Sequence, residues 1–350
     1  MGARSKKKIM CLYPRLRKNK KYVSNKKNGG NVPAVFDKRV LVVPTKCGKC
    51  IECRKAVSRE WQVRLTEDLK DYDNIKMVNL SLSNESIKEL SNAVFDKYFD
   101  EWKVLKDNGL DSKKVKRLGN KLWGYGHDNE IATLAIRRFC ERWRKKYKKS
   151  VRHWFATELG QQNTERIHLH GLLYTDESDK TIKDIWKYGH VHIGDYVNNR
   201  TVNYIIKYIH KVDEKHKHFK SKVLCSSGIG KGYTKRYNSR NNKYKKGKTN
   251  EMYKTREGLK IPLPIYYRNK LYSEKEREKL WIEKLDKEVR YVLGKEIDIS
   301  KNNDVYYKVL KDAQQKNKRF GYGDNEIDWN EYKYENERRE LLRKNLGQKG

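Results

Sequence analysis

Short runs of alternating apolar and polar side chains show where the chain can form β-strands that bury one face. In residues 77–83 every second side chain is apolar: Val78, Leu80 and Leu82. Residues 153–159 and 167–174 are also strand-like, and residues 190–193 could form a further short strand. The alternation therefore predicts several half-buried strands in the middle of the chain.

Apolar side chains at helical spacing predict three helices near these strands. They cover residues 54–69, 129–147 and 202–211. After about residue 270 the two charge signs are mixed and the pattern is again helical. Ser273 and Glu276 form a capping-box pair, which predicts a helix that starts there and continues through Leu293.

Charge separates the chain into three expected regions. Residues 1–46 contain 14 Lys or Arg and one acid, Asp37, which is typical of a basic N-terminal arm. We expect a central domain over residues 47–270, with a basic insertion at about 212–256. Residues 215–250 contain 12 Lys or Arg and no acid, so this insertion is expected to face DNA. Residues 271–350 are expected to form a C-terminal helical region.

The composition indicates a nucleic-acid partner. The 350 residues have a formal net charge of +37, and only 36% of them are hydrophobic. Such an excess of positive charge repels itself in the free protein, so a polyanion is its natural partner. No stretch is long and apolar enough to span a bilayer, and no signal peptide is visible at the N-terminus. We therefore expect no membrane partner and a cytoplasmic location.

A histidine pair on the strand 167–174 is the first candidate for a metal site. His168 and His170 are two residues apart, so on a strand both imidazoles point to the same face. Glu158 ends the preceding strand and would lie opposite this pair if the two strands form a hairpin. A polar strand face would explain His-x-His equally well in general, but the nearby carboxylate favours a divalent-cation site with these three ligands.

Two tyrosines on the predicted helix 202–211 are candidate nucleophiles. Tyr204 and Tyr208 are four residues apart and share a helix face, which Lys211 joins. Tyrosines at this spacing are usually core residues, but an all-aliphatic face on the other side already supplies the core contact. The tyrosine face is thus expected to point outward or into a cleft. A cation that polarises a phosphate and a nearby ammonium would both favour attack by a phenolate.

Three cysteines could hold a structural Zn²⁺. Cys47, Cys50 and Cys53 form a C-x-x-C-x-x-C run, but a closed zinc site needs a fourth ligand. Cys11, Cys225 or a histidine could supply it, and none of them has a diagnostic spacing. Reduced, partly buried thiols are an equally good interpretation.

These motifs resemble those of a known superfamily. His168-Leu-His170 resembles the His-hydrophobe-His motif of HUH endonucleases, and Tyr204 and Tyr208 with Lys211 resemble its two-tyrosine motif. Residues 79–83 are similar to the first motif of such replication proteins. The chain resembles most closely the replication initiators of Microviridae, the small single-stranded DNA phages, and in particular those of the gokushovirus branch. The further segments that carry this resemblance are residues 11–14, 47–54, 228–233 and 263–267.

The resemblance implies both a fold and a site. The fold would be of the α+β class, the HUH endonuclease fold, in which a central antiparallel sheet with RRM-like connections is flanked by helices. His168, His170 and Glu158 would bind Mg²⁺ or Mn²⁺, and Tyr204 and Tyr208 would act as nucleophiles with Lys211 beside them. The expected intermediate is a 5′-phosphotyrosyl link to DNA.

The resulting functional hypothesis is a rolling-circle replication initiator that nicks and rejoins DNA in the cytoplasm of a bacterial host. Its substrate would be single-stranded or locally melted DNA at a replication origin. Residues 225–232 lack the residues of a nucleotide-binding P-loop, so a separate helicase and polymerase from the host are expected. One alternative is a non-catalytic basic protein that binds or packages nucleic acid and contains a zinc-stabilised cysteine cluster. Another alternative, a plasmid initiator or transposase, would use the same DNA-nicking chemistry. The microvirus-like N-terminal sequence disfavours it.

Overall fold

The computed structural model describes residues 11–160, 165–194, 196–211, 216 and 218–320. These residues form two compact units. The first unit combines the residues up to Glu60 with those from Tyr233 onward, and the second unit is Trp61–Gly232. Helix α1 (Ile51–Asp68) contributes residues to both. This division into compact units differs from the predicted domain boundaries at residues 46 and 270. Those boundaries stay a prediction.

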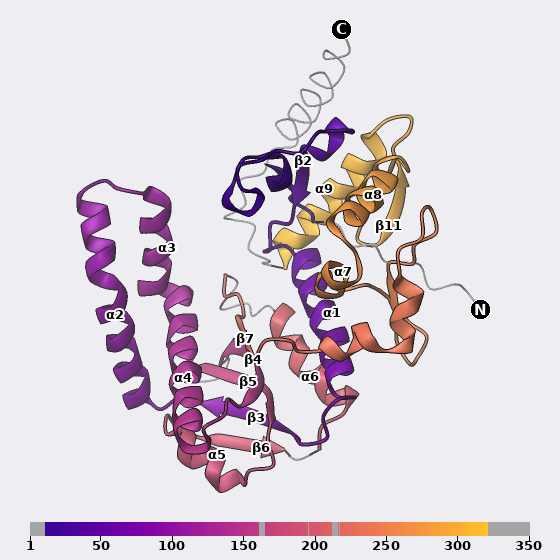
Figure 1. Ribbon diagram of the computed structural model, residues 1–350. Coiled ribbons are helices and arrows are strands. Elements are labelled where there is room, and N and C mark those ends of the chain that lie inside the picture. Colours follow the sequence, from indigo (N-terminus) through magenta and orange to yellow (C-terminus); the bar gives the residue numbers. More distant parts are fainter. Residues whose placement is uncertain (1–10, 161–164, 195, 212–215, 217, 321–350) are drawn as a thin grey trace. The chain divides into compact units, whose positions relative to one another are not determined.

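The second unit is built around a five-stranded, fully antiparallel sheet (Figure 1). Its strand order is β6-β3-β5-β4-β7. The strands are β3 (Ile75–Ser81), β4 (Arg152–Leu159), β5 (Ile167–Tyr174), β6 (Val191–Gly194) and β7 (Val223–Cys225). All the strand predictions for this region are confirmed, with ends that differ by a few residues.

The connections of strands β3, β4, β5 and β6 follow the β-α-β-β-α-β pattern of RRM-like folds. Three helices lie between β3 and β4: α2 (Asn84–Asp107), α3 (Ser112–Leu122) and α4 (Gly124–Tyr147). β4 and β5 form a hairpin, and α5 (Asp179–Trp186) leads from β5 to β6. When β3, β4, β5 and β6 are numbered 1 to 4 along the chain, they lie side by side in the order 4-1-3-2. The last strand therefore pairs with the first, and the first with the third. The predicted α+β class with a central antiparallel sheet flanked by helices is confirmed.

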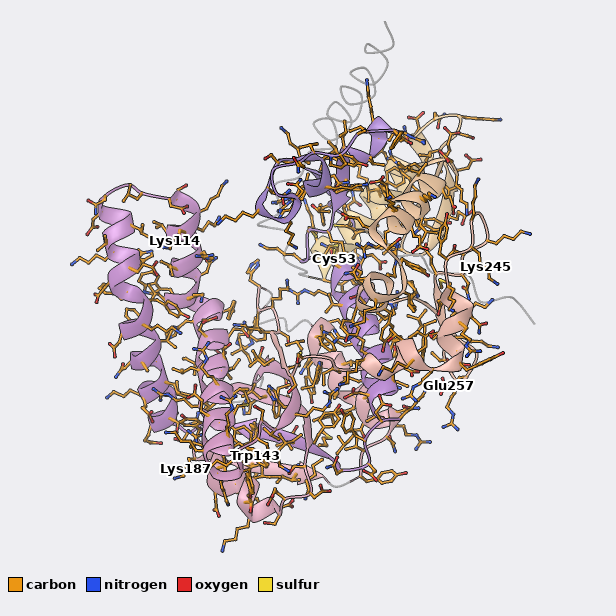
Figure 2. The ribbon with its side chains drawn as sticks, viewed as in Figure 1. Cys53, Lys114, Trp143, Lys187, Lys245 and Glu257 are labelled. Atoms are coloured by element: carbon orange, nitrogen blue, oxygen red, sulfur yellow. The ribbon has the colours of Figure 1, made fainter. Side chains whose placement is uncertain are left out.

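Two apolar cores cover the two faces of this sheet. On one face, side chains of α2, α4 and α5 pack against alternate residues of the strands, such as Phe155 and Leu169. Trp143 of α4 belongs to this core (Figure 2). On the other face, Trp154 and Leu172 pack against α6 (Asn199–His210) and Leu65 of α1. Glu158, His168 and His170 have the same strand parity as Trp154 and Leu172. The face that carries the predicted ligands is therefore the face that α6 covers.

The helical pair α2 and α3 was not predicted from the sequence. Ser83 caps α2 through its hydroxyl, which accepts a hydrogen bond from the Ser86 backbone N–H. Aromatic rings then run along one side of the pair, with Phe99 stacked near Trp102 and Trp102 edge-on to Trp123, the residue before α4. These aromatic contacts join α2 to the α3–α4 connection.

The first unit contains short strand pairs and helices. Its elements outside the cysteine region are β1 (Arg15–Lys18), β2 (Val42–Thr45), β8 (Met252–Lys254), β9 (Lys260–Pro262), α7 (Ile265–Leu271), α8 (Glu274–Leu285), β10 (Val289–Val292), β11 (Lys295–Asp298) and α9 (Asp304–Arg319). The predicted capping box of Ser273 and Glu276 is present at the start of α8. The predicted continuation of this helix through Leu293 is wrong, because β10 and β11 form an antiparallel hairpin there.

Residues 11–46 are more ordered than the basic composition suggested. β1 pairs with β2 in an antiparallel ladder, and the side chains of Leu12, Tyr13 and Val40 are buried. Three 3₁₀ turns, Lys20–Tyr22, Lys26–Asn28 and Lys38–Val40, connect the two strands. The described part of the expected basic insertion has the 3₁₀ segments Lys231–Lys235 and Tyr237–Asn242. Among the described residues, no helix has the length and apolar character needed to cross a membrane.

Candidate active site on the second unit

The strand register brings the predicted ligands together across the hairpin. Glu158 on β4 is the direct partner of His168 on β5, as expected for a β4–β5 hairpin. His170 lies two pairs further along, between Ala156 on β4 and Asn79 on β3. Both imidazoles and the carboxylate are half-buried on the face that α6 covers. The sheet therefore holds three potential ligand side chains in neighbouring positions.

Helix α6 brings the two tyrosines to the same place. Asn198 caps the helix and forms a capping box with Thr201. The four aliphatic residues predicted to face the core are buried: Val202, Ile205, Ile206 and Ile209. Tyr204 is 41% exposed, whereas Tyr208 is only 7% exposed. The two tyrosines thus differ in accessibility, although the sequence predicted that both would face outward or into a cleft.

Tyr208 is buried because it packs on a predicted metal ligand. Its ring is stacked on the imidazole of His170 with a centroid distance of 4.0 Å and an interplanar angle of 10°. Its hydroxyl donates a hydrogen bond to the hydroxyl of Tyr204 over 2.7 Å. The Nζ atom of Lys207 lies 3.8 Å from the centre of the Tyr204 ring. Lys207 was not singled out from the sequence, although its place between the tyrosines was a signal.

Glu158 joins the histidine to the lysine at the end of α6. Its Oε2 atom lies 2.7 Å from His170 Nε2, and its Oε1 atom accepts a hydrogen bond from Lys211 Nζ over 2.6 Å. Burial disfavours the charged form of Glu158, but the hydrogen bonds from His170 and Lys211 outweigh it. The pKa of this carboxyl is therefore lowered from its usual value. The site holds an ionised carboxylate at neutral pH.

Asn79 fixes the orientation of the His170 ring. Its side-chain oxygen lies 2.8 Å from His170 Nδ1. With that oxygen facing Nδ1, the Nδ1–H group donates, and Nε2 is the atom that faces Glu158. A ring that also donates from Nε2 to Glu158 is an imidazolium, and it must lose this second proton before Nε2 can bind a metal. A partner of this kind is typical of ligating histidines. In the sequence, Asn79 only begins the segment that is similar to the first motif of such replication proteins. The pairing of β3 with β5 brings it to His170.

The donor atoms are compatible with a divalent cation after a small movement. Two ligands about 2.1 Å from an octahedral cation and at right angles to each other are about 3.0 Å apart. His170 Nε2 and Glu158 Oε2 are 2.7 Å apart, so a slight separation would admit a shared ion. Burial is the main cause that lowers the pKa of His168 from its usual value, which keeps this imidazole neutral and able to ligate. Among the described residues, however, only the cysteine group described below already has all its ligand atoms within 4.8 Å of one another.

Other residues noted in the sequence lie outside this constellation. His190 and His192 are exposed. His216 is buried, and its Nε2 lies 3.3 Å from a carboxylate oxygen of Glu165. In residues 228–233, one of the segments that carry the family resemblance, the backbone N–H of Gly230 donates to the buried carboxylate of Asp68 over 2.6 Å. This N–H is thus already engaged within the protein.

The cysteine run of the first unit is completed by a residue from the N-terminal segment. Cys11, Cys47, Cys50 and Cys53 form a group that could hold a metal ion. Of the candidate fourth ligands, Cys11 is thus the one that the fold brings to the run. Cys225 belongs to β7 of the second unit, where it is exposed.

A family comparison adds to this geometry. Residues 122–213 match the family model of the replication-associated protein ORF2/G2P. The match covers 92 of the 350 residues and includes Glu158, both histidines, both tyrosines and Lys211. No curated protein and no solved structure matches the chain significantly. The matched segment supports a rolling-circle replication initiator family, for which DNA is the expected partner.

Proposed function

We propose that the second unit is a metal-assisted DNA nickase and strand ligase of the HUH type, which initiates rolling-circle replication. The observation that carries this proposal is the stacking of Tyr208 on His170, with the Tyr204 hydroxyl 2.7 Å from that of Tyr208. A candidate nucleophile therefore lies directly beside a candidate metal ligand. The match to a replication-associated family over this segment supports the same function.

His168, His170 and Glu158 would hold Mg²⁺ or Mn²⁺. When bound there, the ion would polarise the scissile phosphate and stabilise the charge that develops on it. Asn79 orients the His170 ring so that Nε2 faces Glu158 and would be available to the ion, and Lys211 balances the charge of Glu158. The half-buried position of these residues strengthens their electrostatic effect on a phosphate, because less water screens it.

Tyr204 is the better placed residue for the first attack. Its side chain is accessible, its oxygen accepts the hydrogen bond from Tyr208, and the ammonium of Lys207 lies over its ring. Burial, the hydrogen bond with Tyr204 and the charge of Glu158 raise the pKa of Tyr208. Tyr208 is thus suited to remain protonated while Tyr204 reacts.

The reaction conserves the number of phosphodiester bonds. The phenolate oxygen of Tyr204 forms a bond to phosphorus, the bond between phosphorus and the 3′ oxygen breaks, and that oxygen takes a proton. The 5′ end of the DNA is then attached to the protein, and the free 3′-hydroxyl can prime synthesis. After one round, Tyr208 attacks the regenerated junction in the same way. The released 3′-hydroxyl then displaces Tyr204 and closes the circle without ATP.

The proposed biological setting is the replication of a small single-stranded DNA phage related to the gokushoviruses, in the cytoplasm of its bacterial host. The net charge of +37 suits the binding of single-stranded or locally melted DNA at an origin. A host helicase and polymerase would supply strand separation and synthesis.

A nicking assay tests this function. The full-length protein is incubated with a labelled oligonucleotide that carries the origin and with Mg²⁺ or Mn²⁺, and the products are separated on a denaturing gel. We expect a covalent adduct and a free 3′ end. His168→Ala removes cleavage, and the double variant Tyr204→Phe/Tyr208→Phe gives no adduct. An adduct that persists in this double variant would refute the assignment of the nucleophiles.

The alternative is a non-catalytic basic protein that binds or packages nucleic acid, and the cysteine cluster is the observation that favours it. It predicts the same DNA affinity in the wild type and in all these variants, without an adduct in any of them. Tyr196→Phe is a matched control, because Tyr196 is an exposed tyrosine of the second unit that precedes α6 and lies outside the basic insertion. The nickase hypothesis predicts that this control variant forms as much covalent adduct as the wild type.

A further inference from the structure

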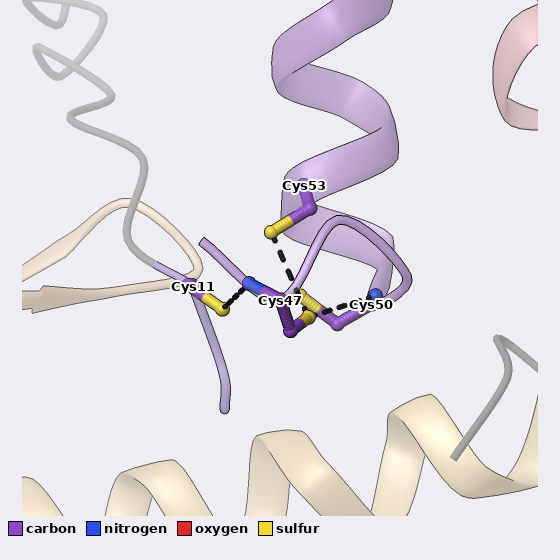
Figure 3. A group of neighbouring side chains, drawn as sticks. All are labelled: Cys11, Cys47, Cys50 and Cys53. Carbon is purple, nitrogen blue, oxygen red and sulfur yellow. Dashed lines mark hydrogen bonds between the residues drawn. The ribbon is translucent and has the colours of Figure 1, made fainter. Parts of the chain in front are cut away.

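Four cysteines from separate parts of the chain meet in the first unit (Figure 3). Cys47 and Cys50 lie in the turn that precedes α1, and Cys53 lies in the first turn of that helix. Cys11 comes from the segment before β1, 36 residues ahead of Cys47. The four sulfur atoms all lie within 4.8 Å of one another. Chance contacts between thiols do not explain why the distant Cys11 joins the cysteines of the local run.

The spacing between the sulfur atoms fits a mononuclear tetrahedral site. A Zn–S bond is about 2.3 Å long, so two sulfur atoms of a tetrahedral site are about 3.8 Å apart. Cys47 Sγ and Cys53 Sγ are 3.8 Å apart. A disulfide would require about 2.0 Å, and all four cysteines are free. Their arrangement therefore suits a shared ion better than a pair of disulfides.

Backbone N–H groups are directed at two of the sulfur atoms. Cys11 Sγ accepts hydrogen bonds from the N–H of Cys47 over 3.1 Å and from that of Tyr13 over 3.4 Å. Cys47 Sγ accepts from the N–H groups of Lys49 and Cys50, each over 3.4 Å. Gly48 has a φ of 76°, which allows the tight turn between the first two cysteines. Such donors stabilise the negative charge of a thiolate, the form that binds a metal.

The cluster lies at the centre of the core of the first unit. Cys50 and Cys53 are fully buried, Cys11 is 8% exposed, and apolar residues of β10, β11 and α9 pack around them. Two polar side chains of α9 extend these contacts. Gln314 donates to the Leu12 carbonyl over 2.8 Å, and the Asn317 side chain accepts from the Ile51 N–H over 2.9 Å. The N-terminal segment, the start of α1 and the C-terminal helix thus all meet at the cysteines.

We propose that Cys11, Cys47, Cys50 and Cys53 bind one structural Zn²⁺ that holds the first unit together. Four thiolates leave no open position for a substrate, so this ion would be structural and distinct from the proposed catalytic ion. Each thiol loses its proton when it binds, and the thiolates give the site a net charge of −2. The ion closes a loop from residue 11 to residue 53 and secures the surface on which α9 packs. The proposal does not depend on the nickase function.

Metal analysis of the purified full-length protein is the first test. We expect about one Zn²⁺ per chain by mass spectrometry of the metal, retained after dialysis against a mild chelator. Cys53→Ser and Cys11→Ser each lower the zinc content. Cys140→Ser and Cys225→Ser are the matched controls and keep it, because neither residue belongs to the cluster. Equal zinc contents in Cys11→Ser and the wild type would show that Cys11 is not a ligand.

Alkylation of the wild-type protein gives a second test that needs no variant to fold. In the holoprotein we expect the exposed Cys225 to react with iodoacetamide, while the four cluster cysteines are protected. A mercurial reagent is then used to release the metal, and it is washed out under reducing conditions. After this treatment, those four cysteines are expected to react. Replacement of zinc by Co²⁺ should produce the intense visible absorption of a tetrahedral thiolate site, altered in Cys11→Ser.

Several outcomes would overturn the zinc proposal. They are a protein that is folded and metal-free as purified, cluster cysteines that react as fast as Cys225, or stoichiometric iron in place of zinc. The nicking assay separates this proposal from the proposed function. A zinc-free protein that still forms the tyrosine adduct would refute only the zinc site, whereas a zinc-loaded protein without an adduct would refute only the nickase.

Discussion

The two candidate metal sites of this protein differ in every property that decides the role of a metal. In the cysteine cluster, four ligand atoms of one kind already lie within 4.8 Å of one another, and most of them are buried. In the histidine site, Glu158 is engaged by Lys211 and His170, and the neighbouring Tyr204 is 41% exposed.

The difference indicates what each site is built for. A closed set of four thiolates holds an ion permanently and stabilises the fold around it. Two imidazoles and a carboxylate leave positions for water or a phosphate, which catalysis needs. The small separation that an ion requires between His170 and Glu158 also suits an ion that exchanges with solvent. The two sites should therefore respond differently to chelators, substitutions and pH.

Metal removal should give the largest contrast. We expect brief treatment with a mild chelator to abolish cleavage of the origin oligonucleotide completely, because the open site loses its ion. Addition of Mg²⁺ or Mn²⁺ restores it. The zinc content and the melting temperature stay unchanged in the same sample. If chelation instead lowers the melting temperature in step with activity, the two sites are not distinct in the way proposed here.

Single tyrosine variants should distinguish the two nucleophiles. We expect Tyr204→Phe to slow the first cleavage by about 100-fold or more, equivalent to about 3 kcal/mol of transition-state stabilisation. Tyr208→Phe removes only a hydrogen-bond donor to Tyr204, so the first cleavage slows by less than about tenfold. Single-turnover cleavage with mass-spectrometric mapping of the adduct provides the measurement. An adduct found mainly on Tyr208 in the wild type contradicts this order.

Asn79→Ala should weaken metal binding without removing a ligand. Loss of a partner that orients a ligating histidine typically costs about 10- to 100-fold in metal affinity or activity. We expect a higher Mn²⁺ concentration for half-maximal cleavage, with much of the activity recovered at saturating Mn²⁺. Asn79→Asp keeps an acceptor oxygen for Nδ1 and should recover part of the affinity. A purely structural role for Asn79 predicts a lower melting temperature with the metal dependence unchanged.

The pH dependence of stability should show the smallest effect. The pKa of His168 is lowered in the folded protein, so the unfolded chain takes up a proton first as the pH falls. The metal-free protein is therefore expected to lose stability as the pH drops below about 6.5, the ordinary pKa of histidine. His168→Gln should flatten this part of the profile, measured by denaturant unfolding at several pH values. An unchanged slope in His168→Gln would assign it to another group.

Local patterns determined much of the second unit. The alternating residues of β3, β4 and β5 and the helical spacing of α4 and α6 depend on neighbours along the chain, so the sequence reveals them directly. The spacing of His168 and His170 also places both imidazoles on one face without knowledge of the fold. Helices α2 and α3 were not predicted. Each has few buried apolar residues, Leu90 and Val94 in α2 and Leu118 and Leu122 in α3, and aromatic contacts such as that of Trp102 with Trp123 supply part of their packing. The continuation of α8 was predicted wrongly because β10 is stabilised by its pairing with β11.

The sequence by itself indicated a nucleic-acid partner, the strands of the central sheet and the three groups of candidate functional side chains. Only the tertiary structure decided that Cys11 completes the cysteine group, that Asn79 faces His170 and that Tyr208 is buried while Tyr204 is exposed. Each of these depends on segments far apart in the chain, brought together by strand register and core packing. Spacing along a strand or helix carries information about one face of one element. Which element lies opposite is decided by the free energy of the whole fold.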